Sequence, residues 1–288
     1  MKVCGFTIIR NALKFDYPVV ESITSILPIC DEFIVAVGNS EDETLDLIKS
    51  INSPKIKIIE TTWDDNLRIG GKVLANETNK AFDAITDDFD WCFYIQSDEI
   101  VHENYHPEIK KQMELEVNNS SIDGLLFKYK HFYGSYDYVG VSRKWYRHEI
   151  RIIKNNKKIR SYRDAQGFRI ENEKLKVKAI DAYIYHYGWV KHPEQQQAKQ
   201  QSFNKMWHDD NWMKQNIKDV NEFDYTAIDL LERFNETHPN VMKNRIEKIN
   251  WNFSFDPTKI KLPVKLKVTH FIEKLTGYRI GEYKNYRF

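Results

Sequence analysis

The stretch Trp91–Val101 reads WCFYIQSDEIV. Five apolar residues, Trp91–Ile95, are followed directly by Gln-Ser-Asp-Glu at positions 96–99. A short apolar run bounded by polar residues is typical of a buried strand. Either this strand leaves the core and its acids meet water, or the acids hold a metal ion at the edge of a sheet. The acid pair taken alone favours the solvated turn, so the choice between these two interpretations depends on the surrounding elements.

The first hundred residues alternate between strand and helix signals. Short apolar runs that predict strands occupy residues 3–9, 33–37, 56–60 and 91–95. Helices are predicted between these runs, at residues 18–27, 40–51 and 71–85. Strands that alternate with helices indicate βαβ units and a mostly parallel sheet. The predicted fold class is therefore α/β, with helices flanking a mostly parallel sheet.

Polar side chains cluster where three of these predicted strands end. Arg10 and Asn11 follow the first strand, residues 38–42 follow the second, and residues 96–99 follow the fourth. In open parallel sheets, ligands bind outside the carboxyl ends of the strands. We therefore expect the three clusters to lie on one ligand-binding edge of the sheet.

The pattern changes from about residue 122. Further strands are predicted at residues 124–131, 150–154 and 179–187, followed by helical, polar sequence from Pro193 and again at 240–250. The last thirty residues, 259–288, contain eight Lys or Arg against two Asp or Glu. Without an internal repeat or a low-complexity linker, two regions are predicted. They are a catalytic domain, residues 1–190, and a mostly helical, basic C-terminal extension, residues 191–288.

The composition excludes several classes of protein. The 288 residues are 41% apolar with a net charge of +1, which indicates a globular chain and gives no global field favouring nucleic acid. Cys4, Cys30 and Cys92 lie in apolar runs without CxxC spacing, so reduced core thiols are expected. No signal-peptide h-region or membrane-spanning apolar stretch is found. The expected location is therefore the cytoplasm.

The order of elements and motifs resembles the family 2 glycosyltransferases, which have a GT-A fold. Their second strand ends in a D-D-G-S-x-D-x-T turn, and residues 37–44 (VGNSEDET) match its Ser, later Asp and Thr. Their following helix carries A-x-x-x-N-x-A, which residues 75–81 (ANETNKA) match. Their next strand ends in D-x-D, and residues 94–100 (YIQSDEI) match it with Gln96 replacing the first Asp. The resemblance covers residues 3–103 well and 124–190 loosely.

The resemblance implies a metal-assisted, inverting transfer of a sugar from a UDP- or GDP-sugar to a glycan or lipid-linked acceptor. It points to enzymes that build bacterial surface polysaccharide or lipopolysaccharide. Asp98 would be the remaining metal-binding acid, and Gln96 and Ser97 would bind the donor. His186, in Tyr185–Trp189, resembles the histidine that completes the family's metal or diphosphate site. The ion would be Mn²⁺ or Mg²⁺, and a neutral imidazole suits Mn²⁺ better.

Other residues are candidates for donor binding. Val37 and Gly38 replace the family's leading acids, so base recognition would fall to Asn39, to Ser40 and to the backbone from Thr7 to Arg10, which includes Ile9. Arg68 and Lys72 flank two glycines in LRIGGK, where the backbone can approach phosphate closely. The alternative for this segment is a plain solvated loop.

An inverting transfer needs a general base to deprotonate the acceptor hydroxyl. Asp164, in YRDAQGF, stands where the superfamily carries such an acid, and an ordinary turn aspartate is the alternative. Glu149, in RHEIRI, is the rival base, although a salt bridge on the strand face with Arg151 is favoured for it. The aromatic segment 129–146 predicts either an acceptor cleft or core packing.

Two other functions stay open. A nucleotidyltransferase would carry a Gly-rich basic loop after the first strand, but the segment there, IIRNALK, has no glycine. A nucleotide- or glycan-binding protein with a decayed catalytic site is supported by Gln96 and the acid-poor turn at 37–38. The basic C-terminus is compatible with peripheral contact with the inner face of a membrane.

Overall fold

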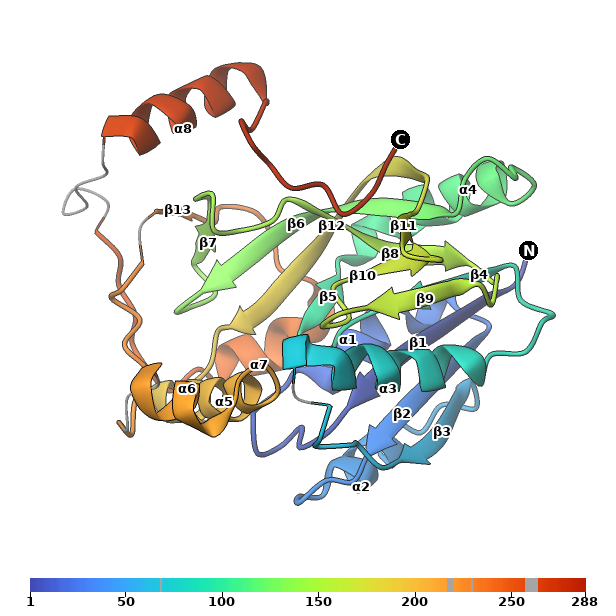
Figure 1. Ribbon diagram of the computed structural model, residues 1–288, viewed down its shortest axis with the longest axis horizontal. Coiled ribbons are helices and arrows are strands. Elements are labelled where there is room, and N and C mark those ends of the chain that lie inside the picture. The colour runs from blue at the N-terminus through green and yellow to red at the C-terminus, as the bar shows by residue number, and fades with distance from the viewer. Residues whose placement is uncertain (68, 217–219, 229, 257–263) are drawn as a thin grey trace.

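The computed structural model describes residues 1–67, 69–216, 220–228, 230–256 and 264–288 (Figure 1). Its first half is a parallel sheet with the strand order β3–β2–β1–β4. These strands are β1 (Val3–Ile9), β2 (Glu32–Gly38), β3 (Ile56–Thr61) and β4 (Trp91–Tyr94). All of β1 and nearly all of β2 are buried, as expected for strands covered by helices on both faces.

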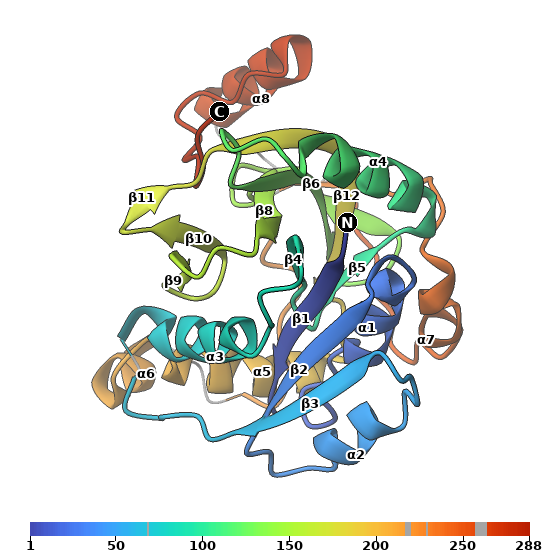
Figure 2. The same ribbon diagram turned by 90° about the vertical axis from the view of Figure 1, so that its right-hand side faces the viewer.

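Helices cover both faces of this parallel sheet (Figure 2). One face packs against α1 (Val19–Ile26) and α4 (His106–Glu116) through a core cluster that includes Ile23 and Met113. The other face packs against α3 (Lys72–Asp83) through a cluster that includes Phe82. The shorter helix α2 (Thr44–Lys49) connects β2 to β3. The predicted α/β class, with a mostly parallel sheet between helices, is confirmed.

The sheet continues beyond β4 through residues of the second half of the chain. Strand β8 (His148–Lys154) pairs antiparallel with both β4 and β6 (Gly124–Tyr133), and β6 pairs parallel with β12 (Val177–Trp189). The short β5 (Glu99–Val101) pairs with β12, so that His186 lies opposite Glu99. This register brings β12 to the turn that follows β4.

Smaller elements complete the fold. A second sheet contains β9 (Ile159–Tyr162), β10 (Gly167–Ile170) and β11 (Glu173–Lys174), while β7 (Tyr138–Gly140) pairs with β13 (Leu231–Arg233). Single 3-10 turns occupy Leu27–Ile29, Ile69–Gly71, Glu103–Tyr105 and Asn240–Met242.

Helices alternate with strand β13 and irregular segments in residues 191–288, the region predicted as a mostly helical C-terminal extension. Its helices are α5 (Pro193–Lys205), α6 (Asp210–Asn216), α7 (Lys243–Glu247) and α8 (Val264–Thr276). The last residues return to the sheets, where Arg287 bridges Lys176. Cys4, Cys30 and Cys92 are free and buried, as predicted. Within the described ranges, no helix is long and apolar enough to cross a membrane.

Candidate functional site

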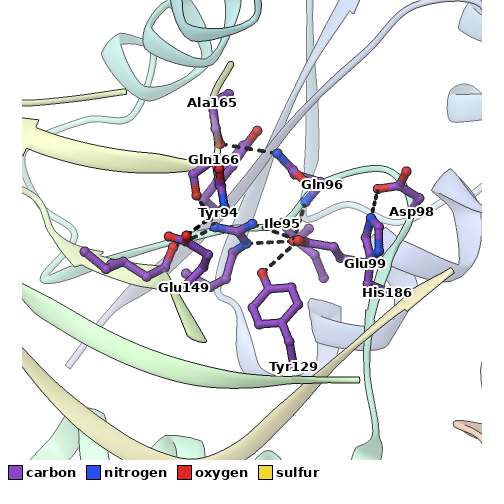
Figure 3. Close-up of polar contacts among 12 residues, drawn as sticks. Tyr94, Ile95, Gln96, Asp98, Glu99, Tyr129, Glu149, Ala165, Gln166 and His186 are labelled. Atoms are coloured by element: carbon purple, nitrogen blue, oxygen red, sulfur yellow. Dashed lines mark hydrogen bonds and ion pairs between the residues drawn. The ribbon is translucent and has the colours of Figure 1, made fainter. Parts of the chain in front are cut away.

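The two adjacent acids after β4 have different environments (Figure 3). Glu99 is fully buried, and its carboxylate accepts hydrogen bonds from the Tyr129 hydroxyl at 2.7 Å and the Gln96 backbone N–H at 3.1 Å. The Arg151 guanidinium donates to both Glu99 oxygens, each at 2.7 Å. Glu99 therefore holds the turn in place from inside the core, and Asp98 is the acid that faces the ligand side.

The Arg151–Glu99 pair corrects one expectation from the sequence. Arg151 was expected to form a strand-face salt bridge with Glu149, but its guanidinium pairs with Glu99, 52 residues away. Both side chains of this pair have no exposed surface. Burial acts to lower the pKa of Arg151, but the Glu99 carboxylate, together with Tyr129 and Tyr146, raises that pKa well above its ordinary value. A buried ion pair therefore supports the turn.

Asp98 lies beside two nitrogen groups from distant parts of the chain. Its Oδ2 accepts a hydrogen bond from the Lys199 ammonium at 3.0 Å, and its Oδ1 lies 3.7 Å from His186 Nε2. Burial acts to raise the pKa of Asp98, but Lys199, with smaller help from other neighbours, holds that pKa below its ordinary range. A Cβ at Gly188 would lie 2.7 Å from both Asp98 Oδ2 and His186 Nε2, so this close grouping requires glycine.

A chain of hydrogen bonds sets the tautomer of His186. The Tyr146 carbonyl can only accept, so His131 Nε2, at 2.8 Å, must carry the hydrogen. Burial lowers the pKa of His131 well below its ordinary value, so this ring is neutral and its Nδ1 is an acceptor. His186 Nδ1, 3.1 Å away, must then donate to it. Since burial also lowers the pKa of His186, its Nε2 keeps a lone pair directed toward Asp98.

This donor set fits a divalent cation. A carboxylate oxygen and an imidazole lone pair face each other without a hydrogen between them. The carboxylate suits both Mn²⁺ and Mg²⁺, and the imidazole suits Mn²⁺ better. His131 plays the part of the outer partner that orients a metal-binding histidine. Across the described ranges, no group of three or more His, Cys, Asp or Glu side chains gathers to hold an ion. Asp98 and His186 would therefore need further oxygen ligands from a bound ligand or water.

A cavity of about 870 Å³ adjoins these residues. It brings together seven of the residues that the sequence singled out: Ile9, Arg10, Gln96, Ser97, Asp98, Asp164 and His186. Lys199 and Tyr146 also line it, and the latter comes from the aromatic segment 129–146. Most other aromatic residues of that segment are buried in core clusters. The cavity lies at the carboxyl ends of β1 and β4, where the strand pattern predicts ligands.

Arg10 is fixed at the end of β1. Its Nε donates to the Asn39 carbonyl at 3.0 Å, and its Nη1 donates to Asp65 at 2.9 Å. Asn39 itself does not line the cavity, and its side-chain oxygen accepts from the Trp63 backbone N–H at 3.0 Å. The guanidinium also lies over the Trp63 ring, 5.7 Å from its centroid. Asn39 therefore positions Arg10.

Lys72 opens α3 beside a smaller cavity of about 600 Å³, which Arg163 and Asn79 also line. Gly70 and Gly71 both have left-handed backbone conformations, with φ of 67° and 68°, which explains the glycine pair. Lys72 does not line the larger cavity. Arg68, the other predicted phosphate contact, lies outside the described residues.

Asp164 lines the larger cavity from the loop between β9 and β10. Its neighbours Arg163 and Ala165 both adopt positive φ, 53° and 60°, so the loop is locally strained around the acid. The Ala165 carbonyl accepts from Gln96 Nε2 at 3.3 Å, which ties the loop to the turn after β4. Burial raises the pKa of Asp164 above its ordinary value. An acid that holds its proton more tightly is a stronger base.

Glu149 lies behind the wall of the cavity and does not line it. Its carboxylate accepts from Gln166 Nε2 at 2.9 Å and from Asn285 Nδ2 at 3.2 Å, and the residue is 2% exposed (Figure 3). Burial raises the pKa of Glu149 to about 7. Gln166, which does line the cavity, separates this acid from the candidate site.

Sequence reasoning missed three residues that build the site. Lys199 lies in a polar, glutamine-rich helix, and nothing in PEQQQAKQQ distinguishes it. His131 lies within the aromatic segment, and Arg151 was paired with the wrong acid. Each of the three contacts a residue more than fifty positions away, so the local sequence pattern does not predict its role in the site.

Comparison with known proteins gives similarity in structure only. No family model matches the chain, and no curated protein matches it in sequence. The structure is similar to S. aureus TarS, with TM-score 0.42 and 16% identity over 70% of this chain and 39% of that one. It is also similar to 4-diphosphocytidyl-2C-methyl-D-erythritol synthase from Anaerococcus prevotii, with TM-score 0.40 and 12% identity over 70% and 94% of the two chains.

A third similar structure is glucosyl-3-phosphoglycerate synthase from Mycobacterium tuberculosis, solved with Mn²⁺, uridine diphosphate and phosphoglyceric acid. Its TM-score is 0.30 and its identity 20%, over 46% of this chain and 43% of that one. The chain thus spans about two fifths of the length of TarS and of this synthase.

Proposed function

We propose that the protein is an inverting, metal-assisted glycosyltransferase that takes its sugar from a UDP- or GDP-sugar. One observation carries this proposal. A single cavity at the carboxyl ends of β1 and β4 is lined by Asp98, His186 and Asp164, which come from three separate segments. The motif resemblance assigned these residues to metal binding and to general base catalysis, and their convergence supports that assignment.

The donor would bind along the turn after β4 and the end of β1. Gln96 and Ser97 line the cavity beside Asp98, and Ile9 and Arg10 line it from β1. Arg10 is held in place by the Asn39 carbonyl, so its guanidinium is ordered before a ligand binds. An ordered guanidinium suits the diphosphate of the donor. Lys72, at the start of α3, is proposed as a further diphosphate contact, and so is Arg68, which lies outside the described residues.

Asp98 and His186 are proposed to hold Mn²⁺ or Mg²⁺. The neutral His186 directs its Nε2 lone pair toward Asp98, and His131 maintains that tautomer. When bound, a divalent ion would neutralise charge that develops on the departing nucleoside diphosphate. Gln96, in the place of a second acid, offers an amide for hydrogen bonding and no charge. Among the residues that the structure describes, Asp98 is therefore the carboxylate proposed to bind the ion.

Asp164 is proposed as the general base. Its carboxylate would accept the proton of the acceptor hydroxyl as the hydroxyl oxygen attacks the anomeric carbon. Burial raises the pKa of Asp164, which strengthens it for this role. Glu149 remains the alternative base, but it would need Gln166 to move aside before it could touch an acceptor.

The acceptor is proposed to be a glycan or a lipid-linked intermediate, used by an enzyme of surface-polysaccharide type. The protein would act in the cytoplasm, with residues 1–190 as the catalytic domain. Helix α8, in the extension 191–288, would contact the inner face of a membrane. Its exposed Val268, Phe271 and Leu275 share helical spacing, and Lys267 and Lys274 supply positive charge.

Donor hydrolysis tests the proposed function. The full chain is incubated with UDP-, GDP- and dTDP-sugars in the presence of Mn²⁺, and release of free nucleoside diphosphate is measured. Hydrolysis of a UDP- or GDP-sugar that Asp98→Ala abolishes is the expected result. Tight nucleotide binding without turnover, with or without candidate acceptors, would instead identify a binding protein with a decayed site.

A further inference from the structure

Lys199 is a largely buried cation at the acid that is proposed to bind metal. Its ammonium donates to Asp98 Oδ2 at 3.0 Å and to the Gly188 carbonyl at 2.9 Å. It also lies over the Tyr17 ring, 5.0 Å from the centroid. Its side chain is 12% exposed and lines the same cavity as Arg10. The ammonium thus faces both the carboxylate and the space proposed for the donor.

Two lysines near Asp98 both lie over the Tyr17 ring. The Lys191 ammonium lies 4.8 Å from the centroid of this ring and donates to the Asp16 backbone carbonyl at 2.6 Å. Asp98 attracts both lysines, but it supplies a single negative charge. An anion entering the cavity would meet the Lys199 ammonium, which lines it and can attract a diphosphate.

A divalent cation and the Lys199 ammonium would compete for Asp98. Two cations at one buried carboxylate repel each other strongly, because the low-dielectric surroundings screen them poorly. The lysine side chain is a flexible four-carbon stem with a compact charge, so it can change partners without movement of the helix. The donor diphosphate would supply the new partner within the same cavity.

We propose that Lys199 is an exchangeable internal cation, which neutralises Asp98 before the donor binds and transfers its ammonium to the donor diphosphate as a divalent ion takes its place. This inference rests on the proposed donor and metal site. Its consequence is that metal and nucleoside diphosphate bind cooperatively. The divalent ion binds weakly alone, since it must displace Lys199, and more tightly with a diphosphate that accepts the displaced ammonium.

Calorimetry with the full chain tests the exchange, using MnCl₂ and UDP separately and together. For the wild type, UDP should tighten Mn²⁺ binding by roughly 10-fold. Lys199→Met should bind Mn²⁺ alone roughly 10-fold more tightly and UDP more weakly, with the cooperativity lost. Lys199→Arg keeps the charge and should retain the wild-type cooperativity. Lys214→Met, on the neighbouring helix α6, is the matched control and should behave as wild type.

If Lys199 is exchanged, its removal should strengthen Mn²⁺ binding and weaken UDP binding. Simple damage to the site would weaken the binding of both ligands. Lys199→Gln keeps an uncharged hydrogen-bond donor near Asp98. It replaces Lys199→Met in the experiment if thermal melting shows that the Met variant is unfolded. Unchanged or weaker Mn²⁺ binding in the uncharged variants would overturn the proposal. If UDP binds to no variant, the proposed function and the transfer to diphosphate both fail. The Mn²⁺ titrations alone then decide whether Lys199 competes at Asp98.

Discussion

The Arg151 guanidinium donates to both carboxylate oxygens of Glu99, and neither side chain has exposed surface. Glu99 in turn accepts from the Gln96 backbone N–H, so this pair fixes the turn that carries Asp98. Asp98 reaches the cavity because its neighbour in the chain is held inside the core. Stability and the geometry of the candidate site are therefore linked through one buried ion pair.

Removing Arg151 should destabilise the fold strongly. Arg151→Met leaves the Glu99 carboxylate buried without its cation, which we expect to lower the free energy of unfolding by about 3–5 kcal/mol. Denaturant unfolding followed by circular dichroism measures this loss. Arg160→Met is the control, because Arg160 also pairs with both oxygens of an acid, Asp83, but at the surface. An exposed pair contributes at most about 1 kcal/mol. Equal losses in both variants would contradict the assigned role of Arg151.

Asp98 should control the effect of metal on nucleotide binding. Asp98→Asn keeps the shape of the side chain but removes the charge that a divalent ion needs, so Mn²⁺ should no longer tighten UDP binding. Asp98→Ala should have the same effect. Calorimetric titration of UDP with and without Mn²⁺ measures the difference, and Ser97→Ala, at the preceding position, should keep the metal effect. An unchanged Mn²⁺ effect in both Asp98 variants would exclude Asp98 as a ligand.

The mostly parallel sheet of the first half, and the edge at which its polar clusters lie, were predictable from the sequence. The apolar runs of β1 and β4 are short, bounded by polar residues and separated by helical segments, and chain connectivity then places their ends together. Asp98 could be located at that edge by the same reasoning. Its partner Lys199 could not, because the two residues are 101 positions apart and the helix around Lys199 has no distinctive pattern.

Glu149 illustrates the same limit within a single strand. It alternates with Arg151 along β8, and that spacing suggested a salt bridge between them. Alternate residues of a strand do point to the same side, but the position of Glu99 across the sheet decides which acid Arg151 binds. Long-range pairing of this kind depends on strand register, which β5 and β12 establish far from β8 in sequence.

Asp164 should be required for transfer but not for donor binding. Asp164→Asn removes the proposed base, so we expect the transfer rate to fall by about 10²- to 10⁴-fold with unchanged UDP affinity. Once an acceptor is identified, initial rates of product formation measure this. Because a base acts in its deprotonated form and burial raises the pKa of Asp164, wild-type rates should fall with decreasing pH at a midpoint above its ordinary value of 3.8. Full transfer activity in Asp164→Asn would exclude Asp164 as the base and would favour Glu149 in that role.

Glu149 should make the fold less stable as the pH rises. Its folded-state pKa is about 7 because of burial, against 4.5 for an ordinary glutamate. Between these values the folded state binds more protons than the unfolded state, so the free energy of unfolding falls with increasing pH. The whole effect is up to roughly 3 kcal/mol. Glu149→Gln should flatten this part of the stability curve, measured by urea unfolding from pH 4.5 to 8. A slope equal to that of the wild type would contradict a raised pKa.

Helix α8 lies apart from the central sheet at the edge of the molecule (Figure 1). Its residues Val268, Phe271 and Leu275 are 52%, 68% and 75% exposed, and their spacing places them on one side of the helix. Arg147 donates to the Gly277 carbonyl at 3.0 Å, which attaches the end of α8 to the rest of the protein. An apolar side flanked by lysines matches the chemistry of an anionic lipid surface.

Replacing two of these apolar residues should release the protein from lipid. Phe271→Ser with Leu275→Ser removes side chains that each contribute about 1.5–3 kcal/mol when buried, so binding to vesicles should weaken by at least roughly 10-fold. Co-sedimentation with vesicles of phosphatidylglycerol and phosphatidylethanolamine measures binding, and neutral phosphatidylcholine vesicles should bind less because they lack the charge that Lys267 and Lys274 attract. Leu115→Ser, at a 63% exposed site on α4, is the matched control and should bind as wild type. Equal binding by all variants, or none by the wild type, would exclude α8 as a membrane contact.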